Sequence, residues 1–131
     1  MESSILNLFS HAKNTQNYSA GETIFREGEP GRTMYVVLEG NVDILVGDNM
    51  LDVAGTGDLF GEMALIDSSA RSATAIAQND CVLAPVDESQ FLRMVDRTPI
   101  FELNVMRVLA DRLRRLDAML YASTYPIRRS D

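Results

Sequence analysis

Hydrophobic and polar residues alternate in short runs through the middle of the chain, from about residue 17 to residue 86. The runs are rich in Val, Ile, Thr and aromatic residues, and Gly, Asn, Asp or Pro separates most of them. This pattern predicts short β-strands joined by turns. The predicted strands span residues 22–25, 34–39, 42–46, 50–54, 71–77 and 81–86. Because their spacing is too tight for crossover helices, we expect an antiparallel β jelly-roll barrel.

Helical patterns flank this β-rich segment on both sides. Near the start, Ser3 or Ser4 can cap a short helix over residues 3–13 that has one apolar side. After the last predicted strand, Asp87 and Gln90 have the spacing of a capping box, which opens another helix.

A longer helix follows at the C-terminal side. Thr98 and Pro99 supply a cap and a first-turn proline for a helix from residue 100 to about 124, and Pro126 prevents its continuation. The predicted fold class is mainly β with flanking helices. We expect one domain over residues 1–131, with an N-terminal helix (1–16), a β-barrel (17–86), C-terminal helices (87–125) and a tail (126–131).

Composition bounds the class of protein. The chain has 131 residues, of which 46% are hydrophobic and 24% charged, as in an ordinary folded domain. No apolar run approaches the roughly 20 residues that span a bilayer, and the start lacks a secretory signal. With a single cysteine, Cys81, the chain forms no internal disulfide. We expect a cytoplasmic protein without membrane contact, in which Cys81 is a small core residue.

The net charge of −7 disfavours direct binding to nucleic acid, since an acidic chain is repelled by the phosphate backbone. Arginines near the C-terminus alternate with Asp111 and Asp117, so we interpret them as part of a solvated helix face. These arginines are Arg107, Arg112, Arg114, Arg115, Arg128 and Arg129.

The single histidine, His11, limits the possible chemistry. Metal sites in small β-barrel enzymes need several imidazoles around one ion, and a catalytic triad would need His11 as its base. We therefore expect no enzyme activity, no metal and no catalytic residues.

One irregular stretch, residues 58–74, carries the candidate chemistry. It reads as a turn, a short helix over residues 62–66, a polar loop, and a strand that opens with Arg71. A helix start suits an anion, and Gly61 before it lets the backbone approach a ligand closely. Arg71 can close over the same anion with a forked contact, and Ser72 adds a hydroxyl donor.

Glu62 allows two interpretations. A carboxylate beside a phosphate is repulsive unless it accepts a hydrogen bond from another part of the ligand, such as a ribose hydroxyl. In that case the ligand is a sugar phosphate. Alternatively, Glu62 and Arg71 form an ion pair that only closes the loop.

Two motifs resemble the phosphate-binding cassette of cyclic nucleotide-binding domains. They are Phe60-Gly61-Glu62-Met63-Ala64-Leu65 and Arg71-Ser72-Ala73-Thr74. Such domains occur in the bacterial cAMP receptor protein, in regulatory subunits of cAMP-dependent protein kinase and in cyclic-nucleotide-gated channels. The resemblance covers about residues 5–120. One departure is Ala70, where many members have proline before the arginine.

The resemblance implies a cyclic nucleotide ligand, with cAMP favoured and cGMP possible. Arg71 would bind the cyclic phosphate and Glu62 the ribose 2′-hydroxyl. Ser72 and backbone groups of Gly61, Met63 and Ala64 would complete the cradle. Phe60 and Ala73 belong to the same motifs and complete the predicted site.

The final helix carries a coiled-coil seam at intervals of 3 and 4. The seam is Met106, Leu109, Leu113, Leu116 and Leu120. This seam predicts a homodimer, unless it packs on the chain's own barrel. A second stripe could serve the barrel instead: Val105, Val108, Arg112 and Met119. In the similar family this helix forms the dimer interface or closes over the base.

We therefore expect a sensor that relays binding to a partner protein through its last helix. Two alternatives stay open. One is the sensing domain of a transcription regulator whose DNA-binding part lies elsewhere, since few residues follow Pro126. The other is a degenerate, non-binding interaction scaffold.

Overall fold

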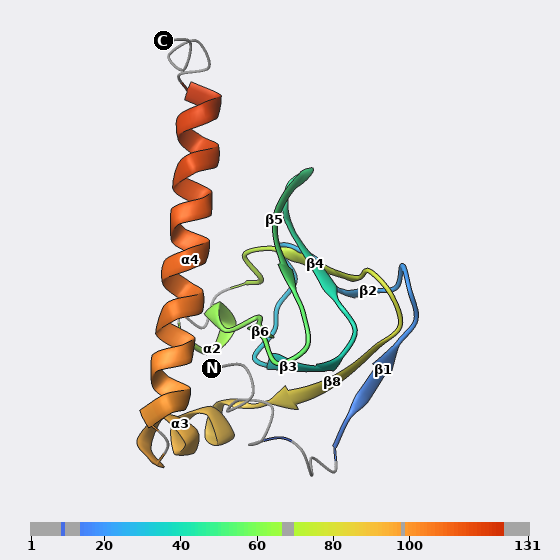
Figure 1. The fold of residues 1–131 in the computed structure, drawn as a ribbon, viewed down its shortest axis with the longest axis vertical. Coiled ribbons are helices and arrows are strands. Elements are labelled where there is room, and N and C mark those ends of the chain that lie inside the picture. Colours follow the sequence, from blue (N-terminus) through green and yellow to red (C-terminus); the bar gives the residue numbers. More distant parts are fainter. Residues whose placement is uncertain (1–8, 10–13, 67–69, 98, 125–131) are drawn as a thin grey trace.

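The structure, a computed structural model, describes residues 9, 14–66, 70–97 and 99–124, with side chains of the last helix described to residue 118 (Figure 1). Four predictions lie outside these residues. They are the N-terminal helix (all but Phe9 of its first thirteen residues), the environment of His11, the cap at Thr98 and the tail over 126–131.

Within the described residues, eight strands form two antiparallel sheets of four. The first sheet has the order β1 (Gln16–Tyr18), β8 (Cys81–Val86), β3 (Met34–Glu39) and β6 (Leu59–Phe60). The second has the order β2 (Thr23–Phe25), β7 (Thr74–Ala77), β4 (Val42–Val46) and β5 (Asn49–Ala54). Strands distant in sequence are neighbours in both sheets, as a jelly roll requires. The predicted mainly β fold with flanking helices is confirmed.

Strand boundaries agree closely with the sequence pattern at β3, β4 and β8. The predicted strand over 71–77 is too long, because β7 begins only at Thr74. Arg71 instead pairs its backbone with the turn after β2: its N–H donates to the Glu29 carbonyl (2.8 Å) and its carbonyl accepts from Gly28 (2.8 Å). Strands β1 and β6 were not predicted, since β6 has only two residues, too few to show alternation, and β1 has the largely polar sequence QNY.

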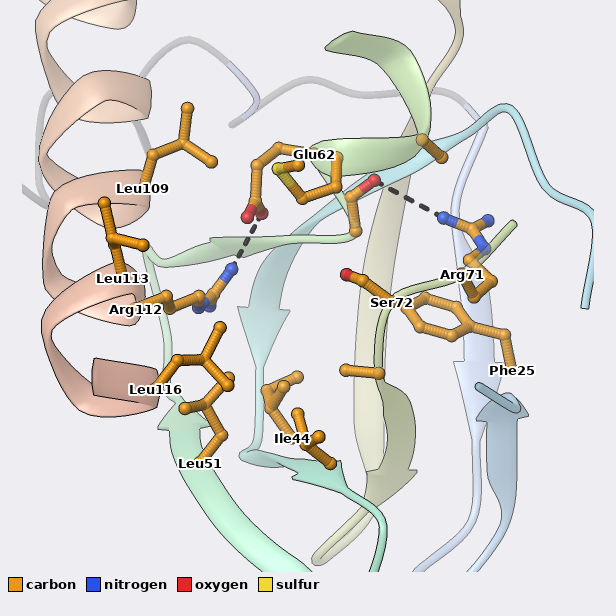
Figure 2. Close-up of a pocket in the computed structure, with 15 residues that line it drawn as sticks. Phe25, Ile44, Leu51, Glu62, Arg71, Ser72, Leu109, Arg112, Leu113 and Leu116 are labelled. Carbon is orange, nitrogen blue, oxygen red and sulfur yellow. Dashed lines mark hydrogen bonds and ion pairs between the residues drawn. The ribbon is translucent and has the colours of Figure 1, made fainter. Parts of the chain in front are cut away.

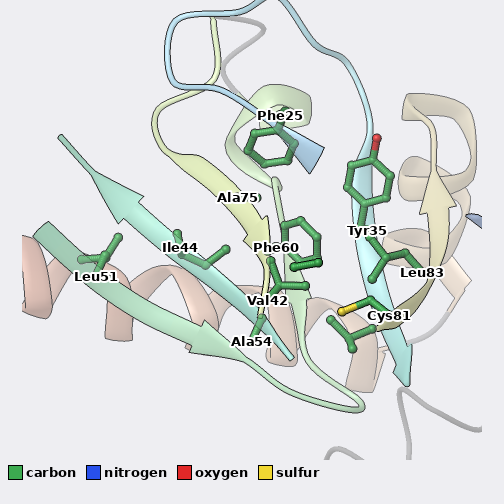
Figure 3. Packing of buried hydrophobic residues seen from close by; sticks show 12 residues of the cluster. Phe25, Tyr35, Val42, Ile44, Leu51, Ala54, Phe60, Ala75, Cys81 and Leu83 are labelled. Carbon is green, nitrogen blue, oxygen red and sulfur yellow. The ribbon is translucent and has the colours of Figure 1, made fainter. Parts of the chain in front are cut away.

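Two apolar clusters lie on the two faces of the first sheet. Strand β3 contributes to both: Tyr35 and Val37 point between the sheets, whereas Met34 and Val36 point toward the helices. Figure 3 shows side chains from both sheets meeting in the cluster between them. Cys81 lies in this cluster, 3% exposed, so its predicted core role is confirmed. Burial raises the pKa of its thiol.

The helices cover the outer face of the first sheet and one edge of the sandwich. The capping box is confirmed at the start of α3 (Glu88–Arg97), where the Gln90 N–H donates to Asp87 Oδ1 (2.8 Å) and the Asp87 N–H to Gln90 Oε1 (3.1 Å). The longer α4 (Pro99–Thr124) buries Phe101 in the cluster on the helix-facing side of the first sheet. It then runs past β5 (Figure 1). Within the described ranges, no helix is both long and apolar enough to cross a membrane.

Candidate functional site

A pocket opens between the sandwich and α4, and the cassette residues form one of its walls (Figure 2). It holds about 790 Å³ of empty space, including the part open to solvent. Seven of the eight predicted site residues line it. They are Gly61, Glu62, Met63, Ala64, Arg71, Ser72 and Ala73.

Phe60, the eighth predicted residue, has a different place. Its side chain is fully buried and stacks on Tyr35 (ring centroids 5.3 Å apart) and beside Phe25 (5.9 Å). Phe60 does not line the pocket. Phe60 therefore supports the cradle by packing in the core between the sheets (Figure 3).

Gly61 supplies the backbone geometry of the cradle. Its φ of 79° lies in the left-handed region, which side chains disfavour. A Cβ at this position would approach Arg71 Nη1 to 3.1 Å and the Thr33 carbonyl to 3.3 Å. Two residues after Gly61, α2 (Met63–Ile66) begins, close to the predicted short helix.

Arg71 is a buried cation without a carboxylate partner among the described residues. Its side chain donates from Nη1 to the Thr33 carbonyl (2.7 Å) and, at 3.4 Å, to the Gly61 carbonyl. The guanidinium lies 4.0 Å from the centre of the Phe25 ring. Its Nε is buried with no hydrogen-bond partner, and burial lowers the pKa of the group. An unpaired buried donor is costly, so this side chain is suited to an incoming anion.

Gly31 determines where the Arg71 side chain can lie. A Cβ on Gly31 would be 2.3 Å from Nε and 2.6 Å from Cζ of Arg71, so only glycine leaves room for the guanidinium here. The sequence shows that Gly31 sits in a turn. It gives no sign that this turn abuts an arginine forty positions away, so Gly31 was not among the predicted site residues.

Glu62 pairs with an unpredicted partner. It is 2% exposed, and its Oε1 accepts a hydrogen bond of 2.7 Å from Arg112 Nη1 of α4. The alternative Glu62–Arg71 ion pair is therefore wrong. Arg112 also donates from Nη2 to the Leu59 carbonyl (2.9 Å) and lies 3.4 Å from Asp52 on β5. Its assignment to a solvated helix face is wrong, whereas its place in the barrel-facing stripe with Val105 and Val108 is confirmed.

The rest of the pocket lining is apolar. The second sheet contributes Phe25, Ile44, Val46 and Leu51, and α4 adds three leucines at its wall: Leu109, Leu113 and Leu116. The residues of the predicted coiled-coil seam therefore differ in their burial. Leu109 and Leu116 are half-buried against the sandwich, while Met106 and Leu113 are 60% and 68% exposed.

No group of His, Cys, Asp or Glu among the described residues could hold a metal ion. The charged side chains that line the pocket are Glu62, Arg71 and Arg112. This combination of one unpaired cation, one paired carboxylate and an aliphatic end suits an organic anion.

Comparison with known proteins supports the same conclusion. The family model described as "Cyclic nucleotide-binding domain" matches residues 15–98. The chain belongs to the cyclic nucleotide-binding domain family. Both cassette motifs lie within the matched residues, and the predicted family is confirmed.

Two curated relatives of this cyclic nucleotide-binding domain illustrate its range. The Cyclic AMP receptor protein of Thermus thermophilus is 37% identical over 108 residues, which are 79% of this chain and 50% of the relative. The cAMP-dependent protein kinase regulatory subunit of Eremothecium gossypii is 40% identical over 77 residues, 59% of this chain and 17% of the relative. The chain thus spans half the length of the first relative and less of the second.

Solved structures show the same fold. The Thermus thermophilus catabolite activator protein has a TM-score of 0.75 and 31% identity. The match covers 93% of this chain and 60% of the activator protein's chain. The EAL enzyme Bd1971 in its cAMP-bound form has a TM-score of 0.60 and 37% identity, covering 85% of this chain and 32% of its own. A cGMP-bound form of that enzyme is also similar, with a TM-score of 0.61.

Proposed function

We propose that this cyclic nucleotide-binding domain is a sensor for cAMP that passes the binding event to a partner protein through α4. The observation that carries the proposal is Arg71, a buried guanidinium at the pocket wall with an unpaired Nε and no carboxylate partner in the described part of the chain. A cyclic phosphate supplies the missing negative charge and acceptors.

In the proposed complex the phosphate lies at Arg71, Gly61 and Ser72, with backbone groups of Met63 and Ala64. Glu62 accepts a hydrogen bond from the ribose 2′-hydroxyl. The base then lies against the aliphatic end of the pocket, where it is held mainly by apolar contact. Because that end offers few groups to hydrogen-bond a base, we expect adenine, which has fewer polar edge groups than guanine, to bind better. cGMP is the weaker second ligand.

The two faces of α4 support the proposed relay. One face carries Leu109, Arg112 and Leu116 into the pocket, so an occupant contacts the helix. The other face exposes Leu103 and Met106, which are available to a second copy or another protein. A ligand changes function only by favouring one of two states, and the docked position of α4 is the element proposed to shift. We further propose a cytoplasmic homodimer without enzyme activity.

Isothermal titration calorimetry tests the ligand directly. We expect saturable binding of cAMP, weaker binding of cGMP, and no comparable binding of 5′-AMP, whose phosphate is not cyclised. A chain that binds none of these nucleotides would instead be a degenerate interaction scaffold.

A second candidate is the sensing domain of a transcription regulator. A match to the CRP-like cAMP-activated global transcriptional regulator of Mycobacterium tuberculosis, 31% identical over 104 residues, favours it. The net charge of −7 predicts that the chain alone binds no DNA. Fluorescence anisotropy with duplex DNA, with and without cAMP, tests this candidate, and cAMP-dependent binding would favour it over relay to a protein partner.

A further inference from the structure

Arg71 is one of three buried charged residues in the part of the chain that the structure describes, and its charge is compensated differently from that of the other two. Glu62 and Arg112 form an ion pair at 2.7 Å. Arg71 instead donates to two backbone carbonyls and contacts an aromatic ring. Its Cζ lies over the Phe25 ring, 4.0 Å from the ring centre. The side chain that neighbours this cation is therefore aromatic and not acidic.

Phe25 is the last residue of β2 and lies outside both cassette motifs. It is 8% exposed and lines the pocket beside Arg71 (Figure 2). A Cβ added to Gly61 would come within 3.4 Å of Phe25 Cε2, so the ring reaches the first cassette motif as well as the second. Its orientation is fixed by packing with Tyr35 and Phe60, whose ring centroids lie 6.2 Å and 5.9 Å away.

An aromatic ring compensates a cation in a different way from a carboxylate. The face of the ring carries partial negative charge and attracts a guanidinium, most strongly where water is excluded. This contact uses none of the N–H donors of the arginine, whereas a carboxylate accepts hydrogen bonds from them. An ion pair would have to be broken before a phosphate could bind to the same donors. The ring contact can persist when a phosphate arrives.

We propose that Phe25 is a positioning residue for phosphate recognition. Its ring holds the Arg71 guanidinium at the pocket wall in the free protein and leaves Nε without a hydrogen-bond partner. Because the side chain is already ordered, little conformational freedom is lost when the ligand binds. This inference rests on the proposed cyclic nucleotide function and extends the phosphate site to β2.

The test measures cAMP binding to the full chain by calorimetry. Phe25→Leu keeps an apolar side chain but removes the ring face, and it should weaken binding by about fivefold. Monofluoro-, trifluoro- and pentafluorophenylalanine at position 25 keep the ring and withdraw negative charge from its face in steps. Affinity should fall along this series. The series also covers the case in which the leucine variant fails to fold.

A double-mutant cycle separates the contact with Arg71 from the shape of the pocket wall. In the Arg71→Ala background, adding Phe25→Leu should change cAMP affinity by no more than about twofold, because the cation that the ring holds is already gone. The same four proteins are unfolded in urea without ligand. There, Phe25→Leu should reduce the free energy of unfolding more in the parent than in Arg71→Ala.

Phe91→Leu is the matched control. Phe91 is also 8% exposed and packs edge-on against Phe101, with ring centroids 5.9 Å apart. It belongs to the other apolar cluster and does not line the pocket. The same substitution there should leave cAMP affinity within about twofold of the parent's, even if it lowers the free energy of unfolding.

Three results would overturn the inference. Equal losses of affinity on Phe25→Leu in the parent and in Arg71→Ala would make Phe25 only a part of the pocket wall. Affinity that does not change with fluorination would show that the ring's charge distribution has no role. Tighter binding along the series would make the ring a competitor of the phosphate. A parent that binds no cyclic nucleotide refutes the proposed function itself, and the urea cycle then tests the contact between Phe25 and Arg71 without ligand.

Discussion

Two buried arginines face the same pocket from opposite sides, and they differ in how their charge is compensated. Arg71, on the sandwich side, donates to backbone carbonyls and keeps an unpaired Nε (Figure 2). Arg112, on the α4 side, has the Glu62 carboxylate at 2.7 Å and a second carboxylate, Asp52, at 3.4 Å.

The difference assigns a polarity to the pocket. Burying a charge without a partner is expensive, so the Arg71 end gains most from an anionic ligand group. The Arg112 end is already neutralised and gains little from a second anion. We therefore expect a nucleotide phosphate to bind at the sandwich side, with the less charged ribose and base toward α4, as in the proposed complex. The predictions below test this polarity.

The largest expected effect is that of removing the unpaired cation. Arg71→Ala should weaken cAMP binding by about tenfold or more, because a charge-assisted hydrogen bond contributes about 1.5–3 kcal/mol. Circular dichroism should show the fold intact. The control is Arg32→Ala, which removes an exposed arginine paired with Glu88 at 3.5 Å and should leave affinity unchanged. An Arg71→Ala variant that binds as tightly as the parent would remove Arg71 from the phosphate site.

A smaller effect should come from moving the same cation without deleting it. In Gly31→Ala the new Cβ would collide with the Arg71 guanidinium, which is the end of a flexible side chain and can shift. We expect a loss of cAMP affinity of about fivefold, because part of the charge-assisted contact is lost. The midpoint of thermal unfolding should change little.

Gly55→Ala provides the comparison for this variant. Its Cβ would also be crowded, at 3.1 Å from Asn41 Oδ1, but it has no contact with Arg71. Affinity should therefore be retained in Gly55→Ala. Equal losses in both alanine variants would mean that crowding at any turn, and not displacement of Arg71, explains the result.

The two sides of the pocket also differ in how well the sequence predicted them. The sandwich side comes from contiguous motifs and from strands such as β4, where apolar Val42 and Ile44 alternate with Asp43. Seven of the eight predicted site residues consequently line the pocket. Phe60 is the exception, because a motif shows which residues recur together and not which of them face inward.

The α4 side was predicted less well for a physical reason. Helical periodicity shows that a helix has apolar faces, but it does not show which face packs on the chain's own sandwich. Leu109 and Leu113 belong to one heptad pattern, yet only Leu109 is half-buried against the sandwich. The pair Glu62–Arg112 and the contact between Gly31 and Arg71 join distant segments, so only the packed fold brings them together.

The third effect concerns the apolar wall that α4 contributes. Leu116 lines the pocket and packs against the cluster between the sheets. Leu116→Ala should weaken cAMP binding by about threefold, since it removes part of one aliphatic contact with the base. Calorimetry measures the change. Unaltered affinity would place the base away from α4 and would contradict the proposed polarity.

The smallest effect on ligand affinity is expected on the outer face of the same helix. Leu103 and Met106 are 41% and 60% exposed and lie away from the pocket, so replacing both with glutamate should leave cAMP affinity unchanged. If this face forms the proposed homodimer, the added charges should convert the dimer to a monomer, because buried like charges oppose association.

Sedimentation equilibrium measures the mass, and Leu116→Ala, on the inner face, should keep the parent's mass. A double variant with the parent's mass would show that this face does not join two copies. Hydrogen exchange over residues 99–124, with and without cAMP, would then show whether α4 responds to the ligand as a relay or is static packing on the sandwich.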